Sequence, residues 1–176
     1  MVLASIRKIS GKKKLSKLKF NAPRPLPFNT IKSIGILYYL KDETELKQLL
    51  KIQKNSFLLE KNVQIICWLK TTKKKPHPKI EGIQFIDRAD FDSNFLPSSK
   101  LTRYFCQQDF DLMLDLTSQY HFPIHAMAVM SNAKLKAGIE HKLNWHLQVR
   151  IKLGEAKQNN PHYLLEQIIV YLEQLF

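Results

Sequence analysis

The stretch FDLMLDLTSQYHFPIHAMAVMSNAKLKAGI, residues 110–139, decides the fold class. Residues 111–116 and 135–139 are short apolar runs, as is typical of buried strands. Between them, Pro123 suits the first turn of a helix, and Ile124, Met127 and Ala128 recur at helical spacing. A strand, a helix and a strand in succession favour a parallel pair of strands that belongs to an α/β sheet.

The same alternation extends along the rest of the chain. Apolar runs at residues 31–40, 63–69 and 83–86 predict further buried strands, and residues 46–59, 98–107 and 161–175 have helical periodicity. Residues 146–153 alternate polar and apolar side chains from His146 onward, which predicts an edge strand with one solvent-facing side. We therefore expect an α/β three-layer sandwich with a mostly parallel, Rossmann-like or flavodoxin-like sheet. The last helix is expected to bury a stripe that ends at Leu175.

The positive charge of the chain is concentrated at its amino-terminal end. The 176 residues have a formal net charge of +13, and residues 1–41 hold ten basic side chains and no acidic one. Pro23, Pro25 and Pro27 force an extended segment that no helix can cross. The sequence therefore predicts a basic arm and proline linker at residues 1–27, followed by a single α/β domain at residues 28–176.

An acid-free basic block attracts phosphate, either on RNA, including the ribosome, or on an anionic membrane surface. A purely solubilising role for these side chains is the alternative. A mitochondrial presequence also stays open, since the segment is weakly amphipathic. The lack of a secretory signal or of an apolar stretch long enough to span a bilayer, together with two free cysteines, favours a cytoplasmic protein. The candidate nucleic-acid-binding residues are Arg7, Lys8, Lys12, Lys13, Lys14, Lys17, Lys19 and Arg24.

Several kinds of site are excluded by composition. The five glycines are too far apart for a G-x-G-x-x-G or a G-x-x-x-x-G-K-[ST] phosphate loop, and the chain has no G-x-S-x-G elbow. Two cysteines cannot form a cysteine-based zinc site. His121 and His125 are four residues apart, but Pro123 between them starts the helix, so the two would not share a face. We expect no cofactor and no metal.

Candidate ligand-binding residues follow two of the predicted strands. Ligands of such sheets bind beyond the carboxyl ends of the strands. The turns after the first and fourth strands hold the candidates Asp42, Thr44, Asp115, Thr117 and Ser118. Alternatively, Asp115 caps the turn or pairs with a lysine. Asp111 is four residues earlier, about 13 Å away at ~3.3 Å per residue, which is too far for a catalytic pair of carboxylates. No catalytic residue is assigned.

Residues 28–40, FNTIKSIGILYYL, and residues 110–139 resemble an uncharacterised family of small α/β proteins of Bacteroidetes-type bacteria. In that family a D-x-L-I-D-L strand leads through a proline-containing helix to an S-x-A-K-x-K-x-G segment. The matching positions are Asp111, Asp115, Pro123, Ser131, Ala133, Lys134, Lys136 and Gly138. The resemblance spans roughly residues 28–176 and implies no activity. The same strand and helix are more weakly similar to the amino-terminal half of heptosyltransferase-type glycosyltransferases.

These observations lead to two hypotheses about function. The first is a non-catalytic α/β protein that binds RNA or the ribosome through its basic arm. The alternative is a nucleotide-binding or sugar-phosphate-binding enzyme of glycosyltransferase-like fold, with its ligand at the turns that follow the strands.

Overall fold

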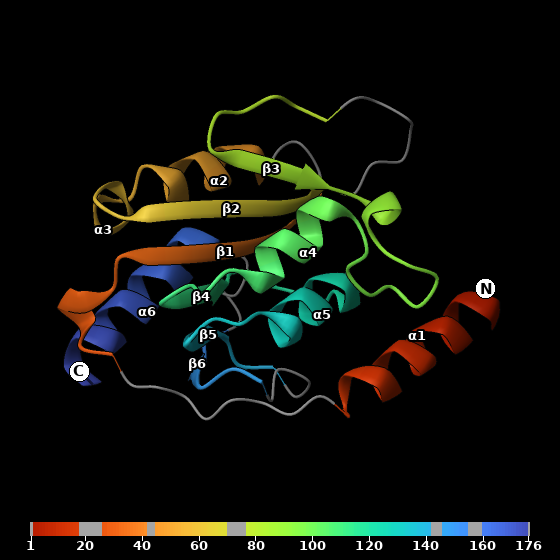
Figure 1. Ribbon diagram of the computed structural model, residues 1–176. Helices are drawn as coiled ribbons and strands as arrows, with labels where there is room; N and C mark the ends of the chain where they lie inside the picture. Colours follow the sequence, from red (N-terminus) through yellow and green to blue (C-terminus); the bar gives the residue numbers. More distant parts are fainter. Residues whose placement is uncertain are drawn as a thin grey trace.

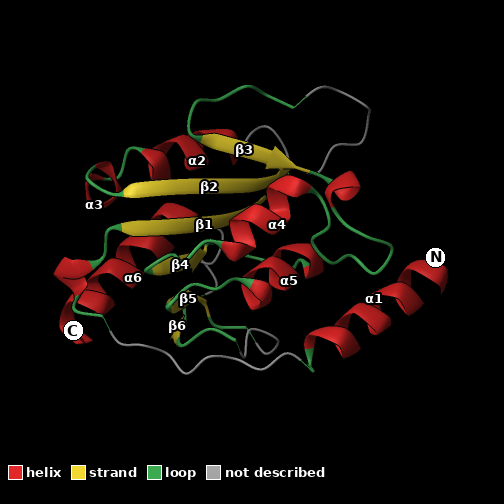
Figure 2. Cartoon of the chain, viewed as in Figure 1, coloured by secondary structure: helices red, strands yellow, loops and turns green. Residues whose placement is uncertain are grey.

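The computed structural model describes residues 2–17, 26–41, 45–69, 77–141, 146–154 and 160–175 (Figures 1 and 2). Its α-helices are α1 (Val2–Leu15), α2 (Leu46–Gln53), α3 (Ser56–Leu59), α4 (Lys100–Gln107), α5 (Phe122–Met130) and α6 (Pro161–Leu175). Its strands are β1 (Ser33–Leu40), β2 (Asn62–Leu69), β3 (Ile83–Ile86), β4 (Leu112–Asp115), β5 (Leu135–Ile139) and β6 (Val149–Ile151).

The six strands form one sheet in the order β3-β2-β1-β4-β5-β6, and every neighbouring pair is parallel. Parallel neighbours require crossover connections, which place helices on the faces of the sheet. Figure 1 shows α4 and α5 on one face and α2 and α6 on the other. The predicted three-layer α/β fold is confirmed, and the sheet is entirely parallel.

Alternating side chains of each strand supply the two halves of the core. In β1, Ile34, Ile36 and Tyr38 join the cluster beneath α2, α3 and α6. Leu37 points the other way and packs with Met113 and the side chains of α4 and α5. Both faces of the central strands are therefore buried, which explains why their sequences read as continuous apolar runs.

Three details differ from the sequence expectations. Strand β6 covers only residues 149–151, and His146, which was predicted to face solvent, is 3% exposed. The predicted helix at residues 46–59 is two helices, because Asn55 accepts a hydrogen bond from the Phe57 N–H and caps a new helix. Leu175 lies outside the buried stripe of α6 and is 49% exposed, since it falls in the last turn of the helix.

The basic segment forms α1, which packs against the outer side of α5 (Figure 1). Leu15 is buried in a small cluster with Phe122, Ala126 and Val129 of α5. Helix α5 is thus covered by the sheet on one side and by α1 on the other, and eight of its nine residues are buried. A helix that is apolar all round needs this kind of double cover. The division into two parts at residue 27 stays a prediction.

Gly11 allows the close approach of α1 to the rest of the protein. A Cβ atom at this position would overlap the carbonyl oxygen of Asn94 and lie 3.0 Å from the ring of Phe122. Replacing glycine with alanine inside a helix normally stabilises it by roughly 1 kcal/mol. We expect Gly11→Ala to do the opposite and to release α1.

The release of α1 is measurable by hydrogen exchange. In Gly11→Ala we expect the α1 amides to exchange at least about tenfold faster, while the amides of the sheet keep their protection. Ile9→Ala is the matched control, because Ile9 is on the same helix and is 65% exposed. Unchanged exchange in α1 of the Gly11 variant would show that the contact with Asn94 does not hold the helix.

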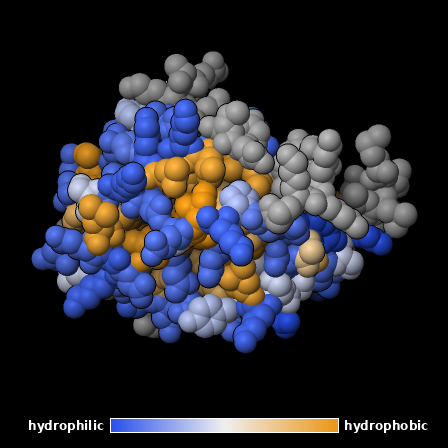
Figure 3. Space-filling view, turned by 90° about the horizontal axis from the view of Figure 1, so that it is seen from above, coloured by the Kyte–Doolittle hydropathy of each residue, from blue (hydrophilic) through white to orange (hydrophobic). Residues whose placement is uncertain are grey.

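The β3 side of the sheet carries an apolar patch. Viewed from above, orange side chains gather at the centre of this face and polar side chains surround them (Figure 3). A shallow hollow on this side is lined by residues between 77 and 85, among them Ile80 and Phe85.

In the described part of the chain, no helix is long and apolar enough to cross a membrane.

Candidate functional site

The carboxyl ends of β1 and β4 lie side by side at the centre of the sheet. Strands β2 and β3 follow β1 on one side of the sheet, and strands β5 and β6 follow β4 on the other side. The strand order therefore reverses between β1 and β4. In open α/β sheets, ligands bind in the crevice beyond the strands at such a point. Asp115 is the last residue of β4 there. Asp42 and Thr44, predicted to share this edge, lie outside the described residues.

Aromatic rings occupy the β1 and β2 side of this edge. The ring of Tyr39, near the end of β1, stacks on His121 with a centroid distance of 4.3 Å and an interplanar angle of 16°. Trp68 of β2 contacts the same imidazole at 4.6 Å. Burial, with a contribution from the positive charge of Lys8, lowers the pKa of His121 to about 4. The imidazole is therefore neutral near pH 7 and serves as a packing group.

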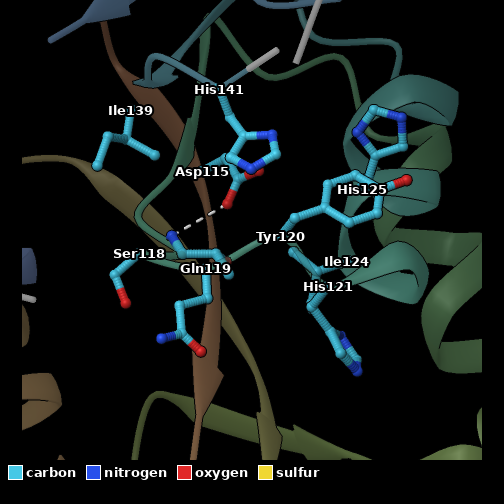
Figure 4. A pocket seen from close by; sticks show the side chains of 10 residues that line it. Asp115, Ser118, Gln119, Tyr120, His121, Ile124, His125, Ile139 and His141 are labelled. Atoms are coloured by element: carbon cyan, nitrogen blue, oxygen red, sulfur yellow. Dashed lines mark hydrogen bonds between the residues drawn. The ribbon is translucent and has the colours of Figure 1, made fainter. Parts of the chain in front are cut away.

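A pocket opens on the β4 and β5 side of the edge (Figure 4). Its walls are Asp115, residues 117–121, the first turn of α5 at Ile124 and His125, and the end of β5 at Ile139 and His141. The pocket has a cavity volume of about 10 Å³, roughly the room for one water molecule. The ring of Tyr120 stacks on His141 at 5.5 Å and contacts His125 at 5.2 Å. The pocket is therefore narrow and has both aromatic and polar walls.

Asp115 is the buried acid of the pocket, with 3% of its surface exposed. Its Oδ1 accepts a hydrogen bond from the Thr117 N–H at 3.1 Å, so the expected turn cap is confirmed. Burial raises the pKa of Asp115 to about 6, and the hydrogen bonding at Thr117 offsets part of this rise. The carboxyl group therefore changes its charge just below neutral pH.

Thr117 and Ser118, two of the candidate ligand-binding residues, line the same pocket. Thr117 is 5% exposed, and its side chain acts on the Asp115 carboxyl group, whose pKa it lowers. Ser118 is half-buried at the wall that it shares with Gln119 in Figure 4.

The side chains of the histidines near α5 do not converge on one site. His121 precedes the helix and its side chain is directed away from that of His125, as Figure 4 shows. His125 packs against His146, with ring centroids 4.7 Å apart at 80°. Burial lowers the pKa of His146 to about 3. Within the described ranges, no group of three or more His, Cys, Asp or Glu side chains could hold a metal ion.

The motif residues shared with the resembled family hold β4, β5 and α5 together. Although partial burial raises the pKa of Asp111, hydrogen bonds from Lys134 at 2.7 Å and from two backbone N–H groups lower it to about 2. Lys136 is 5% exposed, and its Nζ donates to the carbonyl oxygens of Ala128 and Val129 at the end of α5. These side chains satisfy strand and helix ends, so their role is structural.

Neither cysteine has the environment of a reactive thiolate. Cys67 is fully buried in the core, and burial raises its pKa. Burial also raises the pKa of Cys106 to about 12, and its Sγ donates to the carbonyl oxygen of Met127. Both groups are therefore protonated thiols near neutral pH.

The exposed side of α1 is basic. All six candidates that the structure describes here are exposed: Arg7, Lys8, Lys12, Lys13, Lys14 and Lys17. Lys19 and Arg24 lie outside the described residues. The Lys12 Nζ lies 5.6 Å from the ring centroid of Tyr120, which lines the pocket. The Lys8 Nζ and the Arg88 guanidinium both lie over the ring of Phe95, at 5.5 and 4.3 Å. The basic face of α1 therefore borders the pocket.

Sequence reasoning did not place Gln119, Tyr120, Ile139 or His141 in a site. A positional signal was present, since Gln119 and Tyr120 come after the fourth predicted strand, Ile139 ends the fifth and His141 comes after it. The carboxyl ends of neighbouring parallel strands meet at one edge, which brings the two loops together. The proximity of α1 to this edge had no such signal, because it depends on tertiary packing.

No curated protein and no solved structure matches the chain. The comparisons give no support to a glycosyltransferase relationship or to a particular bacterial group. Residues 5–175 match the Family of unknown function (DUF6913), a range that includes most of α1 as well as the sheet. The chain therefore belongs to this family of unknown function.

Proposed function

We propose that the protein binds RNA, free or within the ribosome, through the exposed basic face of α1. The observation that supports this function is the division of α1 into two sides. Leu15 and Gly11 pack against the body, while Lys13 and Lys14 of α1, and Lys17 two residues after its end, are exposed to solvent. A row of cations on a docked helix attracts phosphates at fixed positions, and the release of counterions drives binding.

Two other roles for these lysines are weaker explanations. Basic side chains in the last turn of a helix favour its dipole, but each contributes only about 0.3–1 kcal/mol and one or two would suffice. A helix that lies on a membrane inserts its apolar side into the headgroup region. In α1, Leu15 is already buried against α5, so this part of the apolar side is occupied.

Charge neutralisation tests the proposal without uncovering the core. Deleting residues 1–27 would expose Phe122 and Val129, whereas Lys13→Gln, Lys14→Gln and Lys17→Gln remove only exposed charges. For the triple variant, we expect RNA affinity to fall at least about tenfold at ~100 mM salt. The slope of log affinity against log salt should decrease by about 2, at ~0.7 for each phosphate contact to a single strand.

The matched control neutralises three exposed lysines on the opposite face of the sheet: Lys47, Lys51 and Lys54 of the α2 region. The affinity of this control variant for RNA should be within about twofold of that of the unaltered protein. Equal RNA affinity and equal salt slope in both triple variants would overturn the proposal. Binding to vesicles of phosphatidylcholine and phosphatidylserine without binding to RNA would assign the basic face to a membrane.

The alternative of a nucleotide-binding or sugar-phosphate-binding enzyme has less support. Sites for small molecules usually enclose about 300–1,000 Å³. The pocket beside Asp115 has a cavity volume of only about 10 Å³, roughly the room for one water molecule. This volume does not accommodate a sugar phosphate or a nucleotide.

A further inference from the structure

An exposed aromatic side chain lies on the same face of the sheet as α1. Tyr104 belongs to α4, and 55% of its surface is exposed. Both α4 and α1 pack against α5, so the two helices lie on the same side of the sheet (Figure 1). Single exposed aromatic side chains are common on protein surfaces, so exposure alone does not indicate a binding site. The neighbours of Tyr104 decide whether the ring has a role.

The exposed side of α4 has the composition of a surface that binds nucleic acid. Four exposed residues are spaced three and four positions apart and therefore share one side of the helix: Lys100, Arg103, Tyr104 and Gln107. The helix contains no acidic residue. An aromatic ring flanked by two cations stacks on a base while the cations bind the neighbouring phosphates. This composition fits single-stranded RNA, because its bases are free to stack on a protein side chain.

The loop between β3 and α4 connects this surface with the basic face of α1. The Lys8 Nζ of α1 and the guanidinium of Arg88, in the loop, lie over the same ring, that of Phe95. Two residues after Arg88, the carbonyl oxygen of Asp90 accepts a hydrogen bond from the hydroxyl of Thr102 in α4. The cations of α1, the exposed Arg88 and the cations of α4 therefore follow one another across this side of the protein.

The acidic side chains of the loop are engaged by its own backbone. Asp87, Asp90 and Asp92 each accept hydrogen bonds from backbone N–H groups of the loop. Among the residues that the structure describes, neither Arg88 nor Lys8 forms an ion pair with any of the three. One nitrogen of Arg88 donates to a backbone carbonyl oxygen, which positions the guanidinium and leaves its other N–H groups for phosphate.

We infer that single-stranded RNA extends from the basic face of α1 across this loop to α4, where Tyr104 stacks on an unpaired base. The inference rests on the proposed function, because it adds a second contact to the RNA that α1 binds. The lysines of α1 recognise phosphates, which single strands and duplexes share. The ring of Tyr104 recognises the face of a base, which is covered in a duplex. Tyr104 therefore adds affinity for single strands only.

The test compares a single-stranded RNA with a duplex RNA of the same sequence by fluorescence anisotropy. Both are about 12 nucleotides long, a length that a single-strand site covers. In Tyr104→Ala, the affinity for the single strand should fall about tenfold, the effect of losing one contact between a base and an aromatic ring. Its affinity for the duplex should stay within about twofold. Tyr104→Phe keeps the ring and should keep the affinity for the single strand within about twofold.

Tyr171→Ala is the matched control. Tyr171 is 43% exposed on α6, on the opposite face of the sheet. The affinity of this variant for either RNA should be within about twofold of that of the unaltered protein. A reduced affinity in Tyr104→Ala but not in Tyr171→Ala would assign the effect to the surface of α4.

The salt dependence of binding separates stacking from charge. In Tyr104→Ala the slope of log affinity against log salt should be unchanged, because stacking on a base releases no counterions. In the double variant Lys100→Gln and Arg103→Gln, the slope should decrease by about 1.4, at ~0.7 for each phosphate contact to a single strand. The double variant also tests the surface of α4 without altering the ring.

The possible failures of the inference and of the proposed function are distinguishable. Equal single-strand affinity in Tyr104→Ala and Tyr171→Ala, with binding weakened in the triple lysine variant of α1, overturns the inference and leaves the proposed function standing. An equal loss of affinity for single strand and duplex in Tyr104→Ala also overturns it, since the ring would then not act on an unpaired base. An unaltered protein that binds neither form of RNA overturns both.

Discussion

Gly138→Ala is expected to destabilise the protein by about 3 kcal/mol, because the new methyl group has no space between β4 and β5. Gly138 pairs with Asp115 in the neighbouring strand. A Cβ atom at Gly138 would lie 2.6 Å from the carbonyl oxygen of Asp115 and 3.0 Å from a methyl carbon of Leu147. The oxygen belongs to a strand with neighbours on both sides, so it cannot move without disturbing the sheet. This steric effect is opposite in sign to the usual gain when alanine replaces glycine.

Urea unfolding measures the effect, and Gly154→Ala is its control. No atom lies within 4 Å of a Cβ atom built at Gly154. The free energy of unfolding of this variant should therefore stay within about 0.5 kcal/mol of that of the unaltered protein. The dependence of unfolding free energy on urea should have the same slope in all three proteins. A Gly138 variant as stable as the Gly154 variant would contradict the explanation and show that β5 can shift away from β4.

Asp115→Asn is expected to make the protein more stable at pH 7.5 and to leave its stability nearly unchanged near pH 4. In the folded protein the pKa of Asp115 is raised from 3.8 to about 6. A raised pKa means that burial favours the neutral acid. Ionisation of Asp115 above pH 6 therefore lowers the free energy of unfolding. Relative to the asparagine variant, the unaltered protein should lose roughly 2–3 kcal/mol between pH 4 and pH 7.5.

Other titrating groups do not interfere if the variant and the unaltered protein are compared at each pH. His121 and His146 have lowered pKa values, so their contributions to stability are lost as the pH falls below about 6.5. These contributions have the opposite pH dependence to that of Asp115, and they are common to both proteins. Unfolding free energies measured from pH 4 to pH 7.5 check the difference. A constant difference across this range would contradict a raised pKa at Asp115.

Local patterns in the sequence were sufficient to predict the positions of the strands and of most helices. The runs that became β1, β2 and β5 are apolar because both of their faces are covered, and this coverage follows from the parallel arrangement. The helix predicted at residues 98–107 became α4, and the hydroxyl of Ser99 caps it by accepting a hydrogen bond from the Thr102 N–H. The period-2 pattern at residues 146–153 was misleading at His146, because a polar side chain in such a pattern can still be buried by a neighbouring helix.

The candidate site was predictable in part. Asp115, Thr117 and Ser118 follow a buried strand, and all three line the pocket. The second wall, at Ile139 and His141, required the register between β4 and β5. Register depends on hydrogen bonds between segments that are more than twenty residues apart, so no local pattern records it.

The sequence by itself determined an α/β fold and a basic amino-terminal segment, because periodicity and charge are properties of neighbouring residues. Only the tertiary structure decided where the charge lies. Gly11 and Leu15 fix α1 against α5, and this contact turns a run of lysines into an oriented basic face beside the pocket. Because Phe122–Met130 is apolar on all sides, α5 needs a second element to cover it. That this element is α1 depends on complementary shapes that meet only in the folded chain.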